Sequence, residues 1–95
     1  MSKTLVWNKS FVRAFKRTTA RDRYLQEKIF STLELLSANT FHTSLNTHKL
    51  KGELDGLWAC SVDYYYRIVF ELSKDKSSKK EFILLIDIGT HDEVY

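Results

Sequence analysis

Several features that would define a class of protein outright are missing from this sequence. No apolar run approaches the roughly 20 residues that a membrane-spanning helix requires, so we expect no membrane partner. Residues 1–7 carry one charge and a short apolar run, which is too little for a signal peptide. The single cysteine, Cys60, cannot form an internal disulfide, which fits a reducing compartment. These absences predict a soluble, cytoplasmic protein.

Motifs for metal, phosphate and acyl-transfer chemistry are missing as well. The three histidines and Cys60 form neither a C-x-x-C pattern nor a helical His-x-x-x-His pair. No glycine-rich phosphate loop occurs, and no nucleophile elbow precedes a serine. Cys60 lies in a segment of alternating apolar residues, which favours a core thiol over a nucleophile. We therefore predict no metal and no other cofactor.

What the chain does contain is enough apolar material for one small core. Apolar residues make up 43% of the 95 residues, including two Trp, five Tyr and six Phe. A chain of this length lies near the lower limit for a single unaided hydrophobic core. The composition therefore predicts one domain spanning residues 1–95.

Basic residues are concentrated near the N-terminus, although the net charge is only +3. Within residues 1–23 the one acid is Asp22, and the bases are Lys3, Lys9, Arg13, Lys16, Arg17, Arg21 and Arg23. Such a surface attracts a polyanion through counterion release and long-range steering. It could equally receive an acidic or amphipathic protein segment, or be a solvated helix face. Charge alone does not choose between these.

The first 36 residues predict a strand and two helices. Residues 4–7 form a short β-prone run, and Asn8 is a suitable N-cap for a helix over residues 9–18. Thr19 and Asp22 resemble a capping box that opens a second helix. In that helix the apolar residues Leu25, Ile29, Leu33 and Leu36 recur at helical spacing. Because the connection is short, we expect an antiparallel helical hairpin.

The rest of the chain predicts a small sheet. Residues 38–56 are polar and irregular, and three strand-like runs follow at residues 57–62, 65–72 and 82–88. Residues 82–88 are nearly all apolar, which indicates a central strand. The predicted fold class is α+β, with an N-terminal strand and a helical hairpin packed on one face of a small antiparallel sheet.

A set of polar side chains gathers around one end of this predicted sheet. His48, Lys49 and Lys51 precede it, Arg67 lies on the outward side of a strand, and His91 and Tyr95 follow the last strand. Histidine can transfer protons near neutral pH, arginine can bind phosphate oxygens bidentately, and tyrosine can orient a phosphate or stack on a base. RNA cleavage by its own 2′-hydroxyl needs such groups and no metal. The set is therefore chemically sufficient for a nuclease.

Each of these residues also has an ordinary structural explanation. A histidine in a polar loop is usually just exposed, and Tyr95 could cover a sheet edge. Arg67 could form an ion pair with Asp63 or Asp87, and the run of tyrosines at residues 64–66 could divide between core and surface. The residues by themselves indicate only a possible nucleic-acid binder.

Three stretches resemble the RelE/ParE superfamily of type II toxins, and in particular its YafQ branch. Residues 48–58, HKLKGELDGLW, resemble the loop and strand that lead into the sheet of these toxins. Residues 66–70, YRIVF, resemble the central strand, and residues 88–95, IGTHDEVY, resemble the C-terminal signature. With the helical hairpin and the strand order, the resemblance covers essentially the whole chain.

The resemblance implies a metal-independent endoribonuclease that cuts mRNA on the ribosome and is neutralised by an antitoxin protein. It assigns His48 and His91 to active-site histidines, Arg67 to the phosphate-stabilising arginine and Tyr95 to the terminal aromatic that contacts substrate. Lys49 and Lys51 fall where basic residues accompany the loop, and we expect them to bind substrate. The expected partners are a cognate antitoxin, mRNA and the ribosome.

Two positions depart from the family pattern. The YafQ branch leads us to expect a histidine at Ser61 and an acid at Tyr65, so Tyr65 is interpreted instead as a residue that stacks on a base. Three other functions stay open: a ParE-like poison of DNA gyrase, a catalytically weak relative that acts as a binding module, and a simple RNA-binding domain. Detection of cut mRNA, or of gyrase-linked DNA breaks, would discriminate between the first of these and the nuclease.

Overall fold

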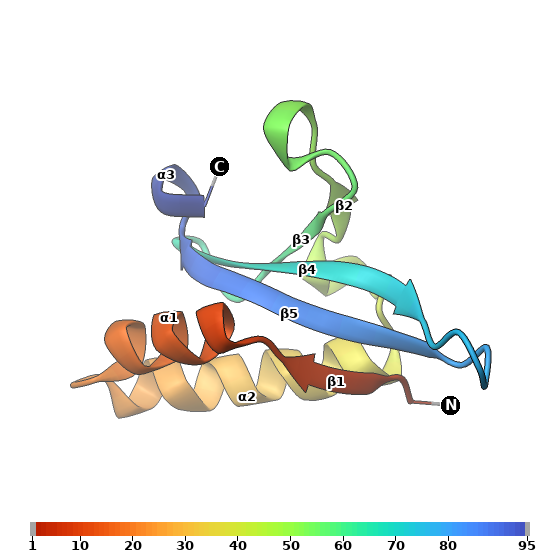
Figure 1. The fold of residues 1–95 in the computed structure, drawn as a ribbon. Coiled ribbons are helices and arrows are strands. Elements are labelled where there is room, and N and C mark those ends of the chain that lie inside the picture. The colour runs from red at the N-terminus through yellow and green to blue at the C-terminus, as the bar shows by residue number, and fades with distance from the viewer. Residues whose placement is uncertain (1, 95) are drawn as a thin grey trace.

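The computed structural model describes residues 2–94, which form a five-stranded sheet with helices on both faces (Figure 1). The strands are β1 (Thr4–Trp7), β2 (His48–Lys49), β3 (Trp58–Ser61), β4 (Tyr66–Lys74) and β5 (Glu81–Thr90). The helices are α1 (Lys9–Thr19), α2 (Arg23–Ala38) and the short α3 (His91–Val94). Two 3₁₀ turns, Thr43–Leu45 and Gly52–Leu54, shape the segment that the sequence predicted to be irregular.

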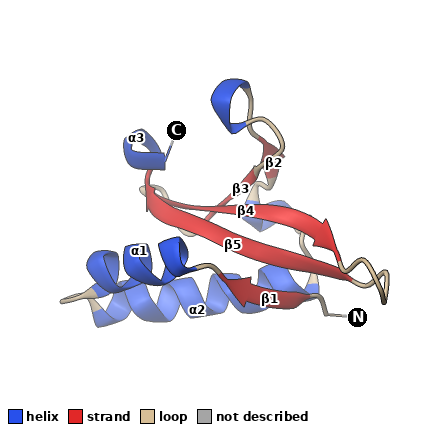
Figure 2. Ribbon diagram, in the orientation of Figure 1, coloured by secondary structure: helices blue, strands red, loops and turns tan. Residues whose placement is uncertain are grey.

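The α+β fold class is confirmed, and the sheet is more complex than predicted. Its order is β1-β5-β4-β3-β2, with β2, β3, β4 and β5 paired antiparallel and β1 paired parallel to β5. The predicted antiparallel sheet is thus extended at this edge by one parallel strand, the predicted N-terminal strand. The helical hairpin lies between β1 and β2 in the chain, and these two strands are the opposite edges of the sheet. Strand β1 is therefore free to run parallel to β5 (Figure 2).

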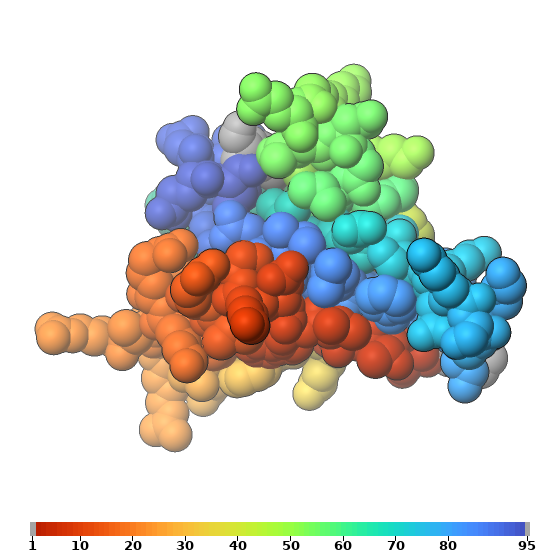
Figure 3. Space-filling model, in the orientation of Figure 1, coloured from red at the N-terminus to blue at the C-terminus, as the bar shows by residue number. Residues whose placement is uncertain are grey.

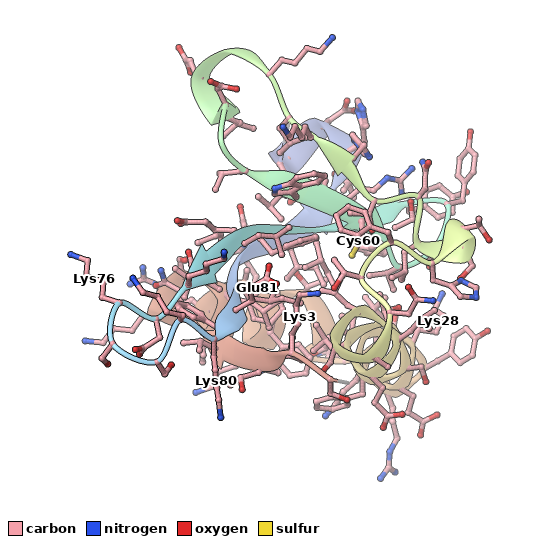
Figure 4. All side chains as sticks on the ribbon, turned by 90° about the vertical axis from the view of Figure 1, so that its right-hand side faces the viewer. Lys3, Lys28, Cys60, Lys76, Lys80 and Glu81 are labelled. Carbon is pink, nitrogen blue, oxygen red and sulfur yellow. The ribbon has the colours of Figure 1, made fainter. Side chains whose placement is uncertain are left out.

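The main core lies between the sheet and the α1–α2 hairpin. The predicted helical stripe is buried, and it meets the apolar side of β4 and β5. Cys60 is completely buried in this core, and Figure 4 shows it between the sheet and the helices. This position confirms the interpretation as a core thiol, and burial raises the pKa of the thiol to about 12.

The capping box predicted at Thr19 and Asp22 does not form, and Asp22 alone caps the second helix. Asn8 caps α1 as expected, and its side chain accepts from the amide of Ser10. Helix α1 then continues through Thr19, whose hydroxyl donates to the carbonyl of Phe15 at 2.8 Å and is not available to cap α2. Asp22 caps α2 by accepting from the amide of Leu25 at 2.9 Å.

Helices were predicted on one face of the sheet, but α3 lies on the other. Figure 1 shows α1 and α2 below the sheet, and α3 with the turn Gly52–Leu54 above it. A second, smaller apolar cluster forms on this upper face and is made of Leu50, Ala59, Val69 and Val94, with Leu54, Leu57 and Ile86 packed against it. We call the side of the sheet that carries this cluster the α3 face.

Candidate active site on the α3 face

Arg67 lies on the α3 face of the sheet, near the start of the central strand β4. In the antiparallel ladder it pairs with Ser61 on one side and Gly89 on the other. Directly paired residues project to the same side of a sheet, and their neighbours project to the opposite side. Ile68, the next residue along β4, is buried in the main core. The alternation that the sequence predicted for this strand is thus confirmed around Arg67.

The guanidinium of Arg67 is fixed by the turn between β3 and β4. Its Nη1 donates to the carbonyl oxygens of Asp63 at 2.7 Å, Tyr64 at 3.1 Å and Tyr66 at 3.1 Å. The sequence left open an ion pair with Asp63 or Asp87, but the structure shows contacts with the backbone of the turn. Its positive charge is therefore held in place and is not paired with a carboxylate among residues 2–94. Such a charge can receive an anionic group.

Helix α3 is seated on the sheet directly beside Arg67, because the residue under it is glycine. A Cβ placed on Gly89 would lie 3.1 Å from the Cβ and Oε1 of Glu93 and 3.2 Å from Cγ1 of Val94. Glu93 also accepts from the amide of Thr90 at 2.8 Å, and this hydrogen bond lowers the pKa of its carboxyl. The close approach and the cap place His91 at the first position of α3, two residues beyond the partner of Arg67.

His91 and His48 belong to different elements, since His91 begins α3 after the interior strand β5 and His48 lies on the edge strand β2. The His91 side chain is 62% exposed, and its Nδ1 lies 3.8 Å from a carboxylate oxygen of Asp92. His48 is half-buried on the edge strand β2, where it pairs with Ala59, and its Nδ1 lies 2.8 Å from the carbonyl of Asn46. Ala59 belongs to the cluster on the α3 face, so His48 projects to the same side as Arg67.

The small apolar cluster joins these segments. Val94 at the end of α3 packs with Leu50, which follows β2 by one residue, and with Ala59 and Val69 of the sheet. The cluster therefore holds α3 and the segment after His48 against one face. Lys51, which is exposed, follows Leu50 directly. The structure thus places Arg67 and His48 on one face of the sheet, and His91 at the start of the helix that covers that face.

Lys49 and Tyr65 are placed differently from these three. Lys49 pairs with Trp58, and its ammonium lies 5.5 Å from the centroid of that indole ring. Trp58 packs against the main core, so Lys49 projects away from the α3 face. Tyr65 is 66% exposed on the β3–β4 turn, next to the carbonyls that Arg67 contacts. Tyr95 lies outside the described residues.

An ion pair that the sequence did not single out supports the Arg67 turn. Lys28 of α2 donates to Asp63, which in turn accepts from the amides of Tyr65 and Tyr66 at 2.9 Å and 2.8 Å. Lys28 and Asp63 are 35 residues apart, and no local pattern connects them. The close contact between Gly89 and α3 was likewise invisible in the sequence, because it depends on α3 folding back over β5.

The basic side of α1 borders the α3 face. Arg13 and Arg17 line a shallow hollow together with Ser10, Ala14, Ile86 and Asp87. The charge of Arg17 contributes to lowering the pKa of Glu93, behind the hydrogen bonds from Thr90, which places it near α3. Figure 3 shows α1 next to the C-terminal segment on the same side of the molecule. A polyanion bound at Arg67 could therefore extend over α1.

The described part of the chain holds neither a metal-binding cluster nor a membrane-spanning helix. Within residues 2–94, no three side chains of His, Cys, Asp or Glu are grouped so that they could hold a metal ion. No helix in the same range is both long and apolar enough to cross a membrane.

Comparisons with known proteins identify a matching family and several similar structures. Residues 3–95 match the family model described as "Bacterial toxin of type II toxin-antitoxin system, YafQ". No curated protein sequence matches. Among solved structures, the fold resembles a YafQ mutant from E. coli, with a TM-score of 0.78, 16% identity and 98% of each chain covered. It also resembles a YoeB/ParE toxin from Agrobacterium tumefaciens, with a TM-score of 0.74, 23% identity, and 93% of this chain and 98% of that one covered.

A third similar structure is the YafQ toxin in the E. coli DinJ-YafQ complex, with a TM-score of 0.76, 17% identity and 98% of each chain covered. These structural likenesses establish the fold, and the family model covers nearly the whole chain, from the first strand to the C-terminal signature. The chain belongs to the YafQ family of bacterial toxins of type II toxin-antitoxin systems.

Proposed function

We propose that this toxin is an endoribonuclease that cleaves mRNA on the ribosome, in the cytoplasm, without a metal ion. The observation that carries the proposal is the position of Arg67, a fixed cation on the face that His48 shares and that α3, with His91 at its start, covers. A scissile phosphate needs a cation for its developing charge and two groups that exchange protons, and this face supplies those types of side chain.

The proposed reaction uses the RNA's own 2′-hydroxyl. One imidazole, of His48 or His91, removes the 2′-hydroxyl proton, and the oxygen attacks the adjacent phosphorus. Arg67, with Lys51, stabilises the extra negative charge on the phosphoryl oxygens. The other imidazole protonates the leaving 5′-oxygen. The products are a 2′,3′-cyclic phosphate and a 5′-hydroxyl, and Tyr95 positions the nucleotide.

Two further residues predicted from the sequence are assigned to substrate binding. Tyr65 stacks on a base beside the scissile phosphate, since its exposed ring lies next to the Arg67 turn. Lys49 is assigned to a more distant part of the RNA strand. It projects to the other side of β2 and so cannot reach the phosphate at Arg67. Ser61 lies directly opposite Arg67, so the position where a family histidine was expected is part of the face but cannot transfer a proton near neutral pH.

The proposed regulatory partner is a cognate antitoxin protein. Structures similar to this chain include toxins in the E. coli DinJ-YafQ complex and in the YoeB-YefM complex from Staphylococcus aureus. Family membership and these complexes support an antitoxin that covers this toxin when it is not active.

Cleavage can be tested on a translated message with purified toxin. We expect a new 5′ end, mapped by primer extension, and a 2′,3′-cyclic phosphate on the upstream fragment. A 2′-deoxynucleotide at the mapped site should abolish the cut, because it removes the nucleophile. Gyrase-linked DNA breaks without RNA cleavage would contradict the proposal and favour a ParE-like function.

The role of Arg67 is tested by two variants. Arg67→Ala should reduce cleavage by ~10³-fold, the range seen when one charge-stabilising donor is removed. Arg67 also contacts the turn carbonyls, so Arg67→Ala removes a structural contact as well as a charge. Arg67→Lys is the second variant, because it keeps a charge and a donor and removes only the bidentate fork. Full cleavage by folded Arg67→Ala protein, with folding checked by circular dichroism, would remove Arg67 from the site.

A further inference from the structure

Three exposed tyrosines surround the turn that fixes Arg67. Tyr64 and Tyr65 of the β3–β4 turn are 84% and 66% exposed, and their rings pack edge to face with centroids 5.2 Å apart. Tyr24, near the start of α2, is 71% exposed. We call these three residues the tyrosine surface. The main core uses none of them, so their rings are available to a ligand.

The Lys28–Asp63 ion pair links the three tyrosines to one another. The Lys28 ammonium donates to Asp63 of the turn and also lies 4.7 Å from the centroid of the Tyr24 ring. Tyr24 on α2 is therefore held beside the turn that carries Tyr64 and Tyr65. Figure 4 shows Lys28 projecting from α2 on this side of the molecule.

The turn itself is fixed before any ligand binds. Asp63 accepts from the amides of Tyr65 and Tyr66, and the amide of Val62 donates to the carbonyl of Tyr66 at 2.9 Å. Partial burial acts to raise the pKa of Asp63, but the hydrogen bonds from Lys28 and the two amides outweigh it and lower that pKa. A surface that is already ordered loses little conformational entropy when it binds a ligand.

The tyrosine surface is directly adjacent to the guanidinium of Arg67. Arg67 Nη1 donates to the backbone carbonyl of Tyr64 at 3.1 Å, so a phosphate held by Arg67 would lie within about one nucleotide of the Tyr64 and Tyr65 rings. Single-stranded nucleic acids are bound by this combination, in which a cation holds the backbone and aromatic rings stack on bases.

We propose that the tyrosine surface binds the nucleobases of unpaired RNA next to the phosphate held by Arg67. The proposal rests on the proposed ribonuclease function and extends it from the scissile phosphate to the neighbouring bases. Since every base has a π-face, this contact would add affinity with little preference for sequence. It also gives Tyr24 and the Lys28–Asp63 pair a function in substrate binding.

Charge and chemistry favour RNA over an antitoxin segment at this surface. The carboxylate of Asp63 is turned toward Lys28 and two amides, so its negative charge is compensated where a phosphate would approach. Arg67 and the phenol rings would suit a base and a phosphate. An amphipathic protein helix requires a hydrophobic groove, whereas these three rings are 66–84% exposed on a turn and on a helix surface.

The test is a binding measurement with RNA that cannot be cut. A labelled single-stranded 2′-O-methyl oligonucleotide lacks the attacking hydroxyl, and its fluorescence anisotropy gives Kd for the purified toxin. We expect Tyr64→Ala/Tyr65→Ala to raise Kd by ~10-fold, and Tyr64→Phe/Tyr65→Phe to stay within about twofold, because the phenyl ring still stacks. Phe41→Ala is the matched control, since it removes a ring that is 56% exposed elsewhere.

A base-free oligonucleotide separates stacking from charge. We expect an abasic strand of equal length to bind wild type more weakly and to show no difference between wild type and Tyr64→Ala/Tyr65→Ala. The slope of log Kd against log salt should be unchanged by the double variant, because no phosphate contact is removed. An equal loss of affinity on the abasic strand would overturn base binding.

The remaining outcomes are separable from failure of the nuclease proposal. Wild-type toxin that binds the oligonucleotide through these tyrosines but cuts no message contradicts the nuclease and leaves the tyrosine surface standing. Toxin that cuts the message while the double variant keeps wild-type Kd overturns the tyrosine surface alone. A double variant that loses affinity for the antitoxin but not for RNA would show that this is a protein-binding surface, and would also overturn the proposal.

Discussion

At the scale of single residues, Cys60 gives a direct test of how tightly the core is packed. Its thiol is fully buried, and burial raises its pKa to about 12, so almost no thiolate is present near pH 8. We expect iodoacetamide at pH 8 to label the folded protein only as fast as the core opens, and to label the urea-unfolded protein rapidly. Prompt labelling in native buffer would contradict the buried position.

The same residue predicts different costs for two small substitutions. Cys60→Ala removes one sulfur from the core, whereas Cys60→Ser places a hydroxyl there. Burial of a polar group without a good partner costs roughly 1–3 kcal/mol, so the serine variant should be the less stable of the two. Urea unfolding followed by tryptophan fluorescence measures the difference, and equal stability of the two variants would contradict it.

The sequence could predict the placement of single residues where local periodicity decides it, but not where contacts between distant segments decide it. The alternation along residues 65–72 placed Arg67 on the outward face of its strand, because strand periodicity is a local property. The three carbonyls that hold its guanidinium are set by the three-dimensional path of the turn. Lys28 and Asp63 are joined only by the packing of α2 beside that turn, so a pattern along the chain could not pair them.

At the scale of elements, one ion pair joins α2 to the β3–β4 turn and should make stability depend on pH. The pKa of Asp63 is lowered in the folded protein, against about 3.9 for an unfolded Asp. The pair therefore contributes stability above that unfolded value, and the contribution is lost as pH falls through the folded pKa. Asp63→Asn should show a flatter fall in stability than wild type from pH 6 to pH 3.

Urea unfolding at a series of pH values measures this, and Asp55→Asn provides a control at an exposed loop carboxylate. The side-chain amide in the Asp63→Asn variant would still offer an oxygen to the backbone amides of Tyr65 and Tyr66, so the turn should persist. Wild type and Asp63→Asn falling in parallel over this pH range would show that the pair is not linked to folding.

The seating of α3 depends on Gly89. Gly89→Ala should displace α3, because its Cβ would meet Glu93 and Val94 at 3.1–3.2 Å. We expect a loss of stability of roughly 1–3 kcal/mol, the usual range for overpacking. Cleavage should fall further than stability explains, since His91 moves with the helix. Glu93→Gln is the control, because it retains an acceptor for the Thr90 amide, and equal activity of the two variants would contradict this role for Gly89.

The elements that sequence could predict were those defined by their own periodicity. The α1–α2 hairpin and the three later strands follow from local patterns, and the structure only shifts the ends of these strands. The parallel pairing of β1 with β5 depends on which sheet edge the hairpin leaves open, and that is decided by packing. The predicted capping box at Thr19 failed because Thr19 ends α1 and its hydroxyl donates to Phe15, while Asp22 caps α2.

At the scale of the whole molecule, the distribution of charge matters more than its sum. The basic residues of α1 border the α3 face, while Lys76 and Lys79 lie on the β4–β5 turn at the far end of the sheet (Figures 1 and 4). Long-range steering should therefore direct an RNA strand toward Arg67 and not toward that turn. A net charge of +3 alone could not predict this direction.

Two double variants with the same change in net charge test the direction. Arg13→Gln/Arg17→Gln should weaken binding of a single-stranded oligonucleotide and reduce the slope of log Kd against log salt by roughly 1.4, the expected release for two neutralised phosphates. Lys76→Gln/Lys79→Gln should leave both quantities close to wild type. Because neither pair touches the reacting atoms, single-turnover cleavage at saturating RNA should be unchanged in both. Equal weakening by the two double variants would mean that RNA responds to net charge only, and that α1 does not extend the path of the strand beyond Arg67.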